Sequence, residues 1–142
     1  MWQQDRWSNG GAHGLGTAVS TDAGATWTDV TPPKFSRCAG GTAANGGDCE
    51  RASDPRVSFA PNGDAYPISL SVNLFTNFAT AVLVSKSTDG GATWESPRIS
   101  YNPGANNSTL GHQIVVRPDG MLVDVFTEFL GFKNSDKGLV GG

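Results

Sequence analysis

Residues 20–27 read STDAGATW, and residues 87–94 read STDGGATW. Seven of the eight positions are identical between these two segments, although the first begins at Ser20 and the second at Ser87. Each segment holds Ser, Asp, Gly, Thr and Trp in the same order, so the same tight turn is expected twice. A segment that recurs in this way indicates a chain built from repeated structural units.

A second, weaker repeat points the same way. Pro61-Asn62-Gly63 is matched by Pro118-Asp119-Gly120, and a run rich in apolar and β-branched residues follows each. Asn-Gly and Asp-Gly pairs tolerate the positive φ angles that tight hairpins need. The sequence therefore predicts a β-hairpin at each of these positions.

One repeated unit is predicted to contain four strands, A to D. In the complete unit they are expected at residues 56–60, 64–72, 80–86 and 98–100, with a local bulge to accommodate Pro67. Further strands are expected at residues 1–4, 14–20, 112–117 and 121–129, with another beginning near Gly138. The chain then divides into the end of one unit (1–30), a Gly-rich connection (31–53), a complete unit (54–100) and the start of the next (101–142).

Composition narrows the class of protein. The 142 residues carry a net charge of −3, only 16% are charged, and 19 are Gly. This balance lacks the high charge of disordered chains and the basic surplus of nucleic-acid-binding proteins. No apolar run approaches the roughly 20 residues of a membrane-spanning helix. Met1 leads into polar residues without a signal peptide, so we expect a segment of a longer chain.

Four-stranded units repeated along a chain favour an all-β fold of the β-propeller type, with antiparallel blades arranged radially. The two Ser-x-Asp-x-Gly-x-Thr-Trp segments resemble the Asp box of the sialidase-like, or BNR-repeat, β-propeller family. The resemblance covers essentially the whole chain and implies about two blades. Because propellers carry roughly 4–8 blades, the remaining blades of a parent protein, or self-association, are expected to cover the open edges.

The resemblance implies a structural role for the two boxes, because the family's boxes lie on the face opposite the active site. In the alternative interpretation, Asp22 or Asp89 is a catalytic carboxylate. The structural interpretation assigns turn hydrogen bonds to the Asp side chains and backbone freedom to the Gly residues. The box residues are Ser20, Asp22, Gly24, Thr26 and Trp27, and Ser87, Asp89, Gly91, Thr93 and Trp94.

Strand direction locates the other face. Since direction alternates, the connections at residues 5–13, 31–54, 101–112 and 128–137 should gather on the side opposite the boxes, where loops on a rigid scaffold commonly bind ligands. Alternatively, the charged residues there form ion pairs at strand ends and the histidine packs within a loop. The candidate ligand-binding residues are Asp5, Arg6, Asp54, Arg56, His112 and Glu128.

A complete catalytic set is not expected. Enzymes of the family that the chain resembles bind the substrate carboxylate with three arginines and use a Tyr nucleophile assisted by a Glu. Arg56 is followed by Val57-Ser58 rather than by Ile-Pro, and neither Tyr66 nor Tyr101 is expected at the centre of a site. No catalytic residue is assigned, no cofactor is expected, and the two His and two Cys show no metal-site spacing.

Cys38 and Cys49 bracket a Gly- and Ala-rich segment. We expect a disulfide between them, the alternative being two free thiols. A disulfide persists in oxidising compartments, so with the resemblance it implies a secreted, extracellular parent protein.

Two functions remain open at this stage. The parent is an exo-acting glycoside hydrolase of the sialidase type that acts on glycans, with the isolated chain inactive, or a non-catalytic propeller that binds glycan or protein. Fold alone does not decide between them.

Overall fold

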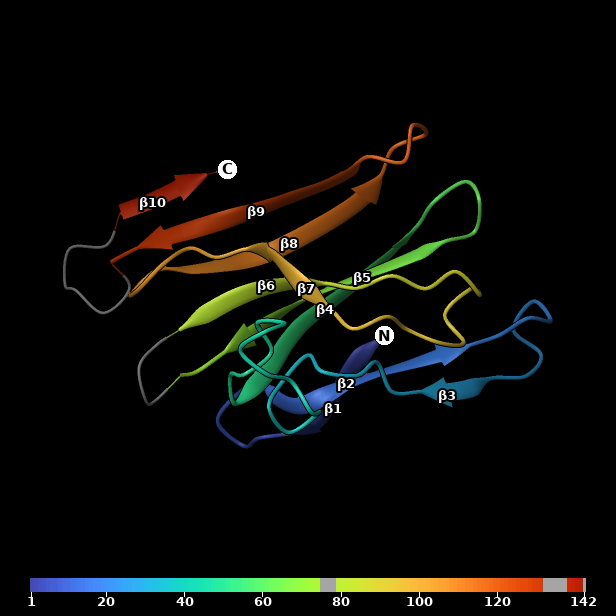
Figure 1. Cartoon of the computed structure of the whole chain (residues 1–142), viewed down its shortest axis with the longest axis horizontal. Helices are drawn as coiled ribbons and strands as arrows, with labels where there is room; N and C mark the ends of the chain where they lie inside the picture. The colour runs from blue at the N-terminus through green and yellow to red at the C-terminus, as the bar shows by residue number, and fades with distance from the viewer. Residues whose placement is uncertain (75–78, 132–137, 142) are drawn as a thin grey trace.

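The computed structural model describes residues 1–74, 79–131 and 138–141. These residues form β-strands and turns and contain no helix, so the all-β prediction is confirmed (Figure 1). No helix in the described residues is long and apolar enough to cross a membrane. The strands are β1 (Trp2–Arg6), β2 (Ala12–Val19), β3 (Thr28–Val30), β4 (Arg51–Phe59), β5 (Ala65–Val72), β6 (Thr80–Val84), β7 (Arg98–Tyr101), β8 (Ser108–Val116), β9 (Leu122–Leu130) and β10 (Gly138–Gly141).

The strands pair only with antiparallel neighbours, in three successive groups. The first group is β1-β2-β3, the second is β4-β5-β6-β7, and the third is β8-β9-β10. A single bridge between Ala12 and Ala52 joins the first group to the second, and the third forms a separate sheet. Among the described strands neither sheet closes on itself.

Alternating strand direction separates the connections into two sets. The β4–β5 and β8–β9 hairpins and both boxes lie toward the right of Figure 1, and the other described connections lie toward its left. The expected connection at residues 128–137 extends beyond the described residues after Gly131. Residues from different strand groups can therefore lie close together on the left-hand side and bind the same ligand.

The two A strands, β4 and β8, share an irregularity that the sequence did not reveal. The register of β4 against β5 shifts between Ser53 and Arg56, and that of β8 against β9 shifts between Leu110 and Gln113. Asp54 has a φ of 51° and Gly111 a φ of 74°, so each bulge contains a residue in the left-handed region. Both bulges extend their strands in front of the predicted starts at residues 56 and 112.

The bulge expected at Pro67 is not present, because Pro67 pairs with Val57 in regular register. The carbonyl of Pro67 accepts a hydrogen bond from Ser85 N at 3.1 Å. In an antiparallel strand the N–H and C=O of one residue point to the same neighbour, so the missing N–H faces Ser85, just after β6 ends. One ladder bond is lost at a strand end, and no bulge is needed.

Two apolar clusters lie between the successive groups. The first cluster contains Leu15 from β2, Phe35 from the connection, and Ala52, Ala81 and Leu83 from the second group. The second cluster brings Ile68, Leu70 and Val82 of the second group against Ile114 of β8. The second group is therefore covered on both faces.

The connection between β3 and β4 is compact. Phe35 and Ser36 are fully buried, and Ser36 Oγ donates a hydrogen bond to the carbonyl of His13. Arg37 N donates to Cys49 O at 2.8 Å. A Cβ added to Gly47 would collide with the carbonyl oxygen of Lys34, so this close backbone approach requires glycine.

The expected disulfide is not formed in this compact connection. Cys38 and Cys49 are both free thiols, the first exposed and the second buried. Cys38 Sγ lies 3.9 Å from the Glu50 carbonyl and Cys49 Sγ 3.8 Å from that of Ala79, so each thiol contacts a different part of the chain. Burial raises the pKa of the Cys49 thiol. Backbone hydrogen bonds and the Phe35 anchor hold the segment without a covalent link.

Candidate functional site

Three of the six candidate ligand-binding residues line one open cleft. Arg6 at the end of β1 and Asp54 and Arg56 in β4 surround a volume of about 380 Å³. The rest of the wall consists of Met1, Trp2, Gln3 and Pro55. Residues far apart in sequence are thus brought together by the way that β1 lies against β4.

The β4 bulge determines where Asp54 lies. Asp is among the residues that tolerate positive φ, and bulges redirect side chains near functional sites. Ser53 Oγ donates a hydrogen bond to Asp54 Oδ1 at 3.0 Å, and Gln3 Nε2 donates to Ser53 Oγ at 3.2 Å. This relay from β1 to β4 holds the carboxylate at the edge of the cleft.

The two arginines supply the positively charged hydrogen-bond donors of the cleft. Arg56 donates one hydrogen bond to the carbonyl of Pro55, at 3.1 Å. Within the described part of the chain neither Arg6 nor Arg56 forms an ion pair, whereas Arg98 pairs with Glu95 at 3.6 Å. Guanidinium groups bind carboxylates through paired N–H donors. The cleft can therefore receive an anionic group.

The remaining candidates lie elsewhere and have partners within the chain. Asp5 Oδ2 is 2.7 Å from His13 Nδ1. His112 is buried, with Nδ1 2.7 Å from Asp124 Oδ2 and Nε2 2.8 Å from Thr109 Oγ1. Both ring nitrogens of His112 are engaged, so this side chain cross-links β8 and β9.

Glu128 accepts a hydrogen bond from the Tyr101 hydroxyl at 2.8 Å. This hydrogen bond and the negative charge of Glu128 raise the pKa of Tyr101, because both favour the protonated phenol. A raised pKa works against a phenolate nucleophile. The Tyr101–Glu128 pair therefore acts as a link between β7 and β9.

Arg51 is a buried charge that the sequence analysis did not identify. Its Nη1 donates to Asn9 Oδ1 at 2.7 Å and to the Gly10 carbonyl, and its guanidinium lies 5.1 Å from the Trp7 ring centre. The partners come from a distant, earlier loop of the chain, so no local pattern could have marked this residue. Arg51 ties the β1–β2 loop to the start of β4.

The two boxes share the same hydrogen bonds around their Asp side chains. In the first, Ser20 Oγ donates to Asp22 Oδ1 at 2.8 Å, and the N–H and hydroxyl of Thr26 donate to the Asp22 carboxylate at 2.9 and 2.6 Å. The same contacts hold Asp89, at 2.7, 2.9 and 2.6 Å. The Thr side-chain and backbone hydrogen bonds, then the Ser hydroxyl, lower the pKa of both carboxyls to about 2. Both Asp residues are thus occupied by their own turns.

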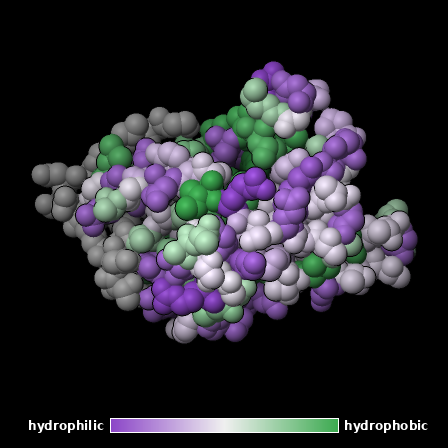
Figure 2. All heavy atoms as spheres, in the orientation of Figure 1, coloured by the Kyte–Doolittle hydropathy of each residue, from purple (hydrophilic) through white to green (hydrophobic). Residues whose placement is uncertain are grey.

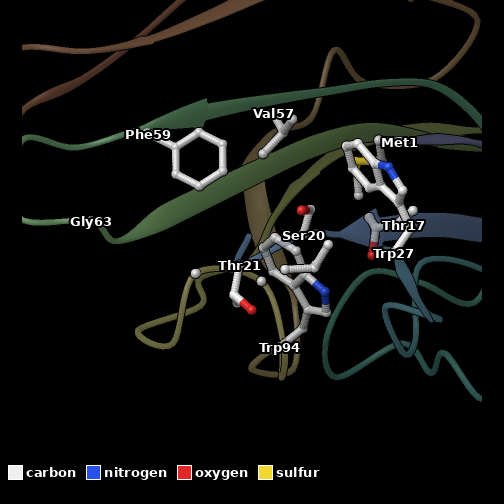
Figure 3. Close-up of a pocket in the computed structure, with 13 residues that line it drawn as sticks. Met1, Thr17, Ser20, Thr21, Trp27, Val57, Phe59, Gly63 and Trp94 are labelled. Carbon is white, nitrogen blue, oxygen red and sulfur yellow. The ribbon is translucent and has the colours of Figure 1, made fainter. Parts of the chain in front are cut away.

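A larger groove of about 520 Å³ lies between the two boxes (Figure 3). Trp27, Trp94, Val57 and Phe59 border it, and it contains no ionisable side chain. Trp27 is 63% exposed, so it does not fill the space between strands. We place the candidate site at the cleft rather than at this groove, because the cleft has charged groups that can orient a polar ligand.

Within the described residues there is no group of three or more His, Cys, Asp or Glu side chains able to hold a metal ion. Comparison with protein-family models, with curated proteins and with solved structures finds no match in any of the three.

Proposed function

We propose that the chain is about two blades of a sialidase-like β-propeller and that its arginine cleft binds carboxylate-bearing glycans. The fold part of the proposal is supported by the strand order, in which the second group is a complete four-stranded meander between two partial ones. It is further supported by the hydrogen bonds around Asp22, which recur around Asp89 in the second box.

One observation carries the binding proposal. Arg6 and Arg56 line the same cleft, neither is paired with a described carboxylate, and Asp54 beside them can accept hydrogen bonds from hydroxyl groups. An acidic sugar presents both a carboxylate and hydroxyls, so it matches this mixture of donors and acceptors.

The parent protein is proposed to be an exo-acting glycoside hydrolase of the sialidase type, secreted from the cell. The isolated chain is proposed to be inactive, because neither Tyr66 nor Tyr101 lines the cleft and the cleft holds two arginines rather than three. The alternative is a non-catalytic propeller that binds glycan or protein; it is favoured because no tyrosine of the described residues lines the cleft.

Binding is tested by titrating the full chain with sialyllactose and, in parallel, with neutral lactose, using calorimetry or NMR shifts. We expect sialyllactose alone to bind, and Arg56→Ala or Arg6→Ala to weaken binding roughly 10- to 100-fold, the size of a lost hydrogen bond to a charged group. Arg98→Ala removes an equal charge from exposed β7 and should leave affinity unchanged.

Equal affinity of the Arg56→Ala and wild-type chains, or no binding by the wild type at millimolar ligand, would refute the proposed site. Turnover of a fluorogenic sialoside by the pure chain would contradict the proposed inactivity but not the proposed binding site.

A further inference from the structure

The β4–β5 and β8–β9 hairpins are equivalent residue by residue. The register pairs Ser53–Leu70, Arg56–Ile68 and Phe59–Ala65 recur in the later hairpin as Leu110–Thr127, Gln113–Val125 and Val116–Leu122. The bulge recurs at the same place, at Asp54 and Gly111. Each residue of β9 can therefore be compared with the β5 residue in the same structural position.

This comparison exposes a difference in burial. Ile68 of β5 is 1% exposed because β8 covers it, whereas its equivalent in β9, Val125, is 55% exposed. Val115 and Leu110 of β8 lie on the same face as Val125, since directly paired residues in a sheet share a face. We call this surface, formed by Leu110, Val115 and Val125, the tail face. Hydrophobic atoms also gather over β8 and β9 in Figure 2.

The opposite end of the molecule carries a complementary surface. Trp2 and Gly16, which pair in the first group, correspond to Ser69 and Leu83, which pair in the second group. The two pairs are separated along the chain by the same number of residues as the two boxes. Ser69 and Leu83 are buried, and Leu83 belongs to the cluster that packs on the first group, whereas Trp2 is 40% exposed. We call the outer side of β1 and β2, where Trp2 lies beside its paired residue Gly16, the head face.

The same two kinds of surface already pack on each other inside the chain. At the first cluster, Leu15 of the first group lies against Leu83 of the second group. At the second cluster, Ile68 of the second group lies against Ile114 of the third group. We propose that the chain self-associates head to tail, the tail face of one copy packing on the head face of the next. The contact continues the sheet-on-sheet stacking already present between the three groups. An interface of this heterologous kind builds a ring if its rotation closes and a filament if it does not.

Sedimentation velocity or light scattering over micromolar to millimolar concentrations tests the proposal. The wild type is expected to form species that grow with concentration, beyond a dimer. A carboxylate buried in an apolar contact opposes association strongly, so Val125→Asp or Trp2→Asp should weaken it roughly 100-fold or more. Phe59→Asp is the matched control, since this exposed residue lies on neither face, and it should associate like the wild type.

A mixture of the two blocked variants is the decisive experiment. The Val125→Asp chain keeps its head face and the Trp2→Asp chain keeps its tail face, so equimolar mixing should give a 1:1 dimer and nothing larger. Circular dichroism of each variant verifies that it is folded. A wild type that stays monomeric, a Trp2→Asp chain that associates like the wild type, or a mixture that stays monomeric would each overturn the proposal. Trp2 also lines the arginine cleft, so association is measured without any glycan and its outcome does not depend on whether the cleft binds one.

Discussion

At the scale of single residues, the box carboxylates combine high exposure with a strongly lowered pKa. Asp22 and Asp89 are both on the surface, yet hydrogen-bond donors from their own turns surround each of them. Short, local hydrogen bonds, rather than burial, fix these turns. This explains how so short a segment can specify its structure in two places with little help from the rest of the chain.

The lowered pKa of these carboxyls makes stability depend on pH. The folded-state pKa is about 2, against an ordinary value of 3.8, so the stabilising effect is complete above pH 4 and is lost as the pH falls toward 2. Replacing Asp89 with Asn removes the charge and the acceptor for the Thr93 hydroxyl. We expect Asp89→Asn to lower the urea midpoint at pH 7 and to flatten its dependence on pH between 4 and 2.

Asp29→Asn is the control for this experiment, because Asp29 is exposed in β3 and belongs to neither box. Its urea midpoint should follow that of the wild type at every pH. If the Asp89→Asn chain lost stability in acid as steeply as the wild type, the box carboxylate would not be the titrating group.

At the scale of elements, the predicted strands of the complete unit lie within a few residues of those observed, apart from the earlier start of β4. Alternating apolar residues and the Asn-Gly and Asp-Gly turns carried enough local information for this. β3 was not predicted, since the short run from Thr28 to Val30 is too brief to show a pattern. The bulges were missed because they interrupt the alternation on which strand prediction depends.

The candidate site was predictable only in part. Arg6, Asp54 and Arg56 were identified from their positions at strand ends, and the structure places them around one cleft. The His112–Asp124 contact could not be read from the sequence, because it depends on the β8–β9 register, which the bulge shifts. Long-range partners of this kind are set by packing rather than by local pattern.

The β8 bulge is expected to make the stability of the chain sensitive to substitution of Gly111. Gly111 has a φ of 74°, and a Cβ added there would meet no atom within 4 Å, so Gly111→Ala introduces backbone strain without a clash. We expect it to lower the free energy of unfolding by about 1–2 kcal/mol, the cost of left-handed backbone for an L-residue. Chemical denaturation followed by tryptophan fluorescence measures this.

Gly14→Ala is the matched control, because Gly14 has ordinary strand φ and its added Cβ would make only a normal contact, 3.6 Å from Ala39. Its effect should be smaller than that of Gly111→Ala. Equal losses in the two variants would indicate that glycine is required at position 111 for some reason other than its φ angle.

At the scale of the whole molecule, the two apolar clusters make some strands more resistant to local unfolding than others. β5 and β6 lie between both clusters, with Ile68 and Leu83 almost fully buried. β9 is covered on one face only. We expect amide hydrogen exchange in β6 to be roughly 100-fold or more slower than in β9, measured in dilute solution where copies do not associate. Comparable rates in the two strands would contradict this division.

The agreement of every β4–β5 register pair with a β8–β9 pair has a modular consequence. A chain that passed directly from Pro61 to Asp119 would regenerate a Pro-Asp-Gly turn, with β4 in place of β8 beside β9. The two hairpins are thus interchangeable parts. Such a chain can gain or lose a whole unit by recombination at these turns while every remaining strand keeps its register.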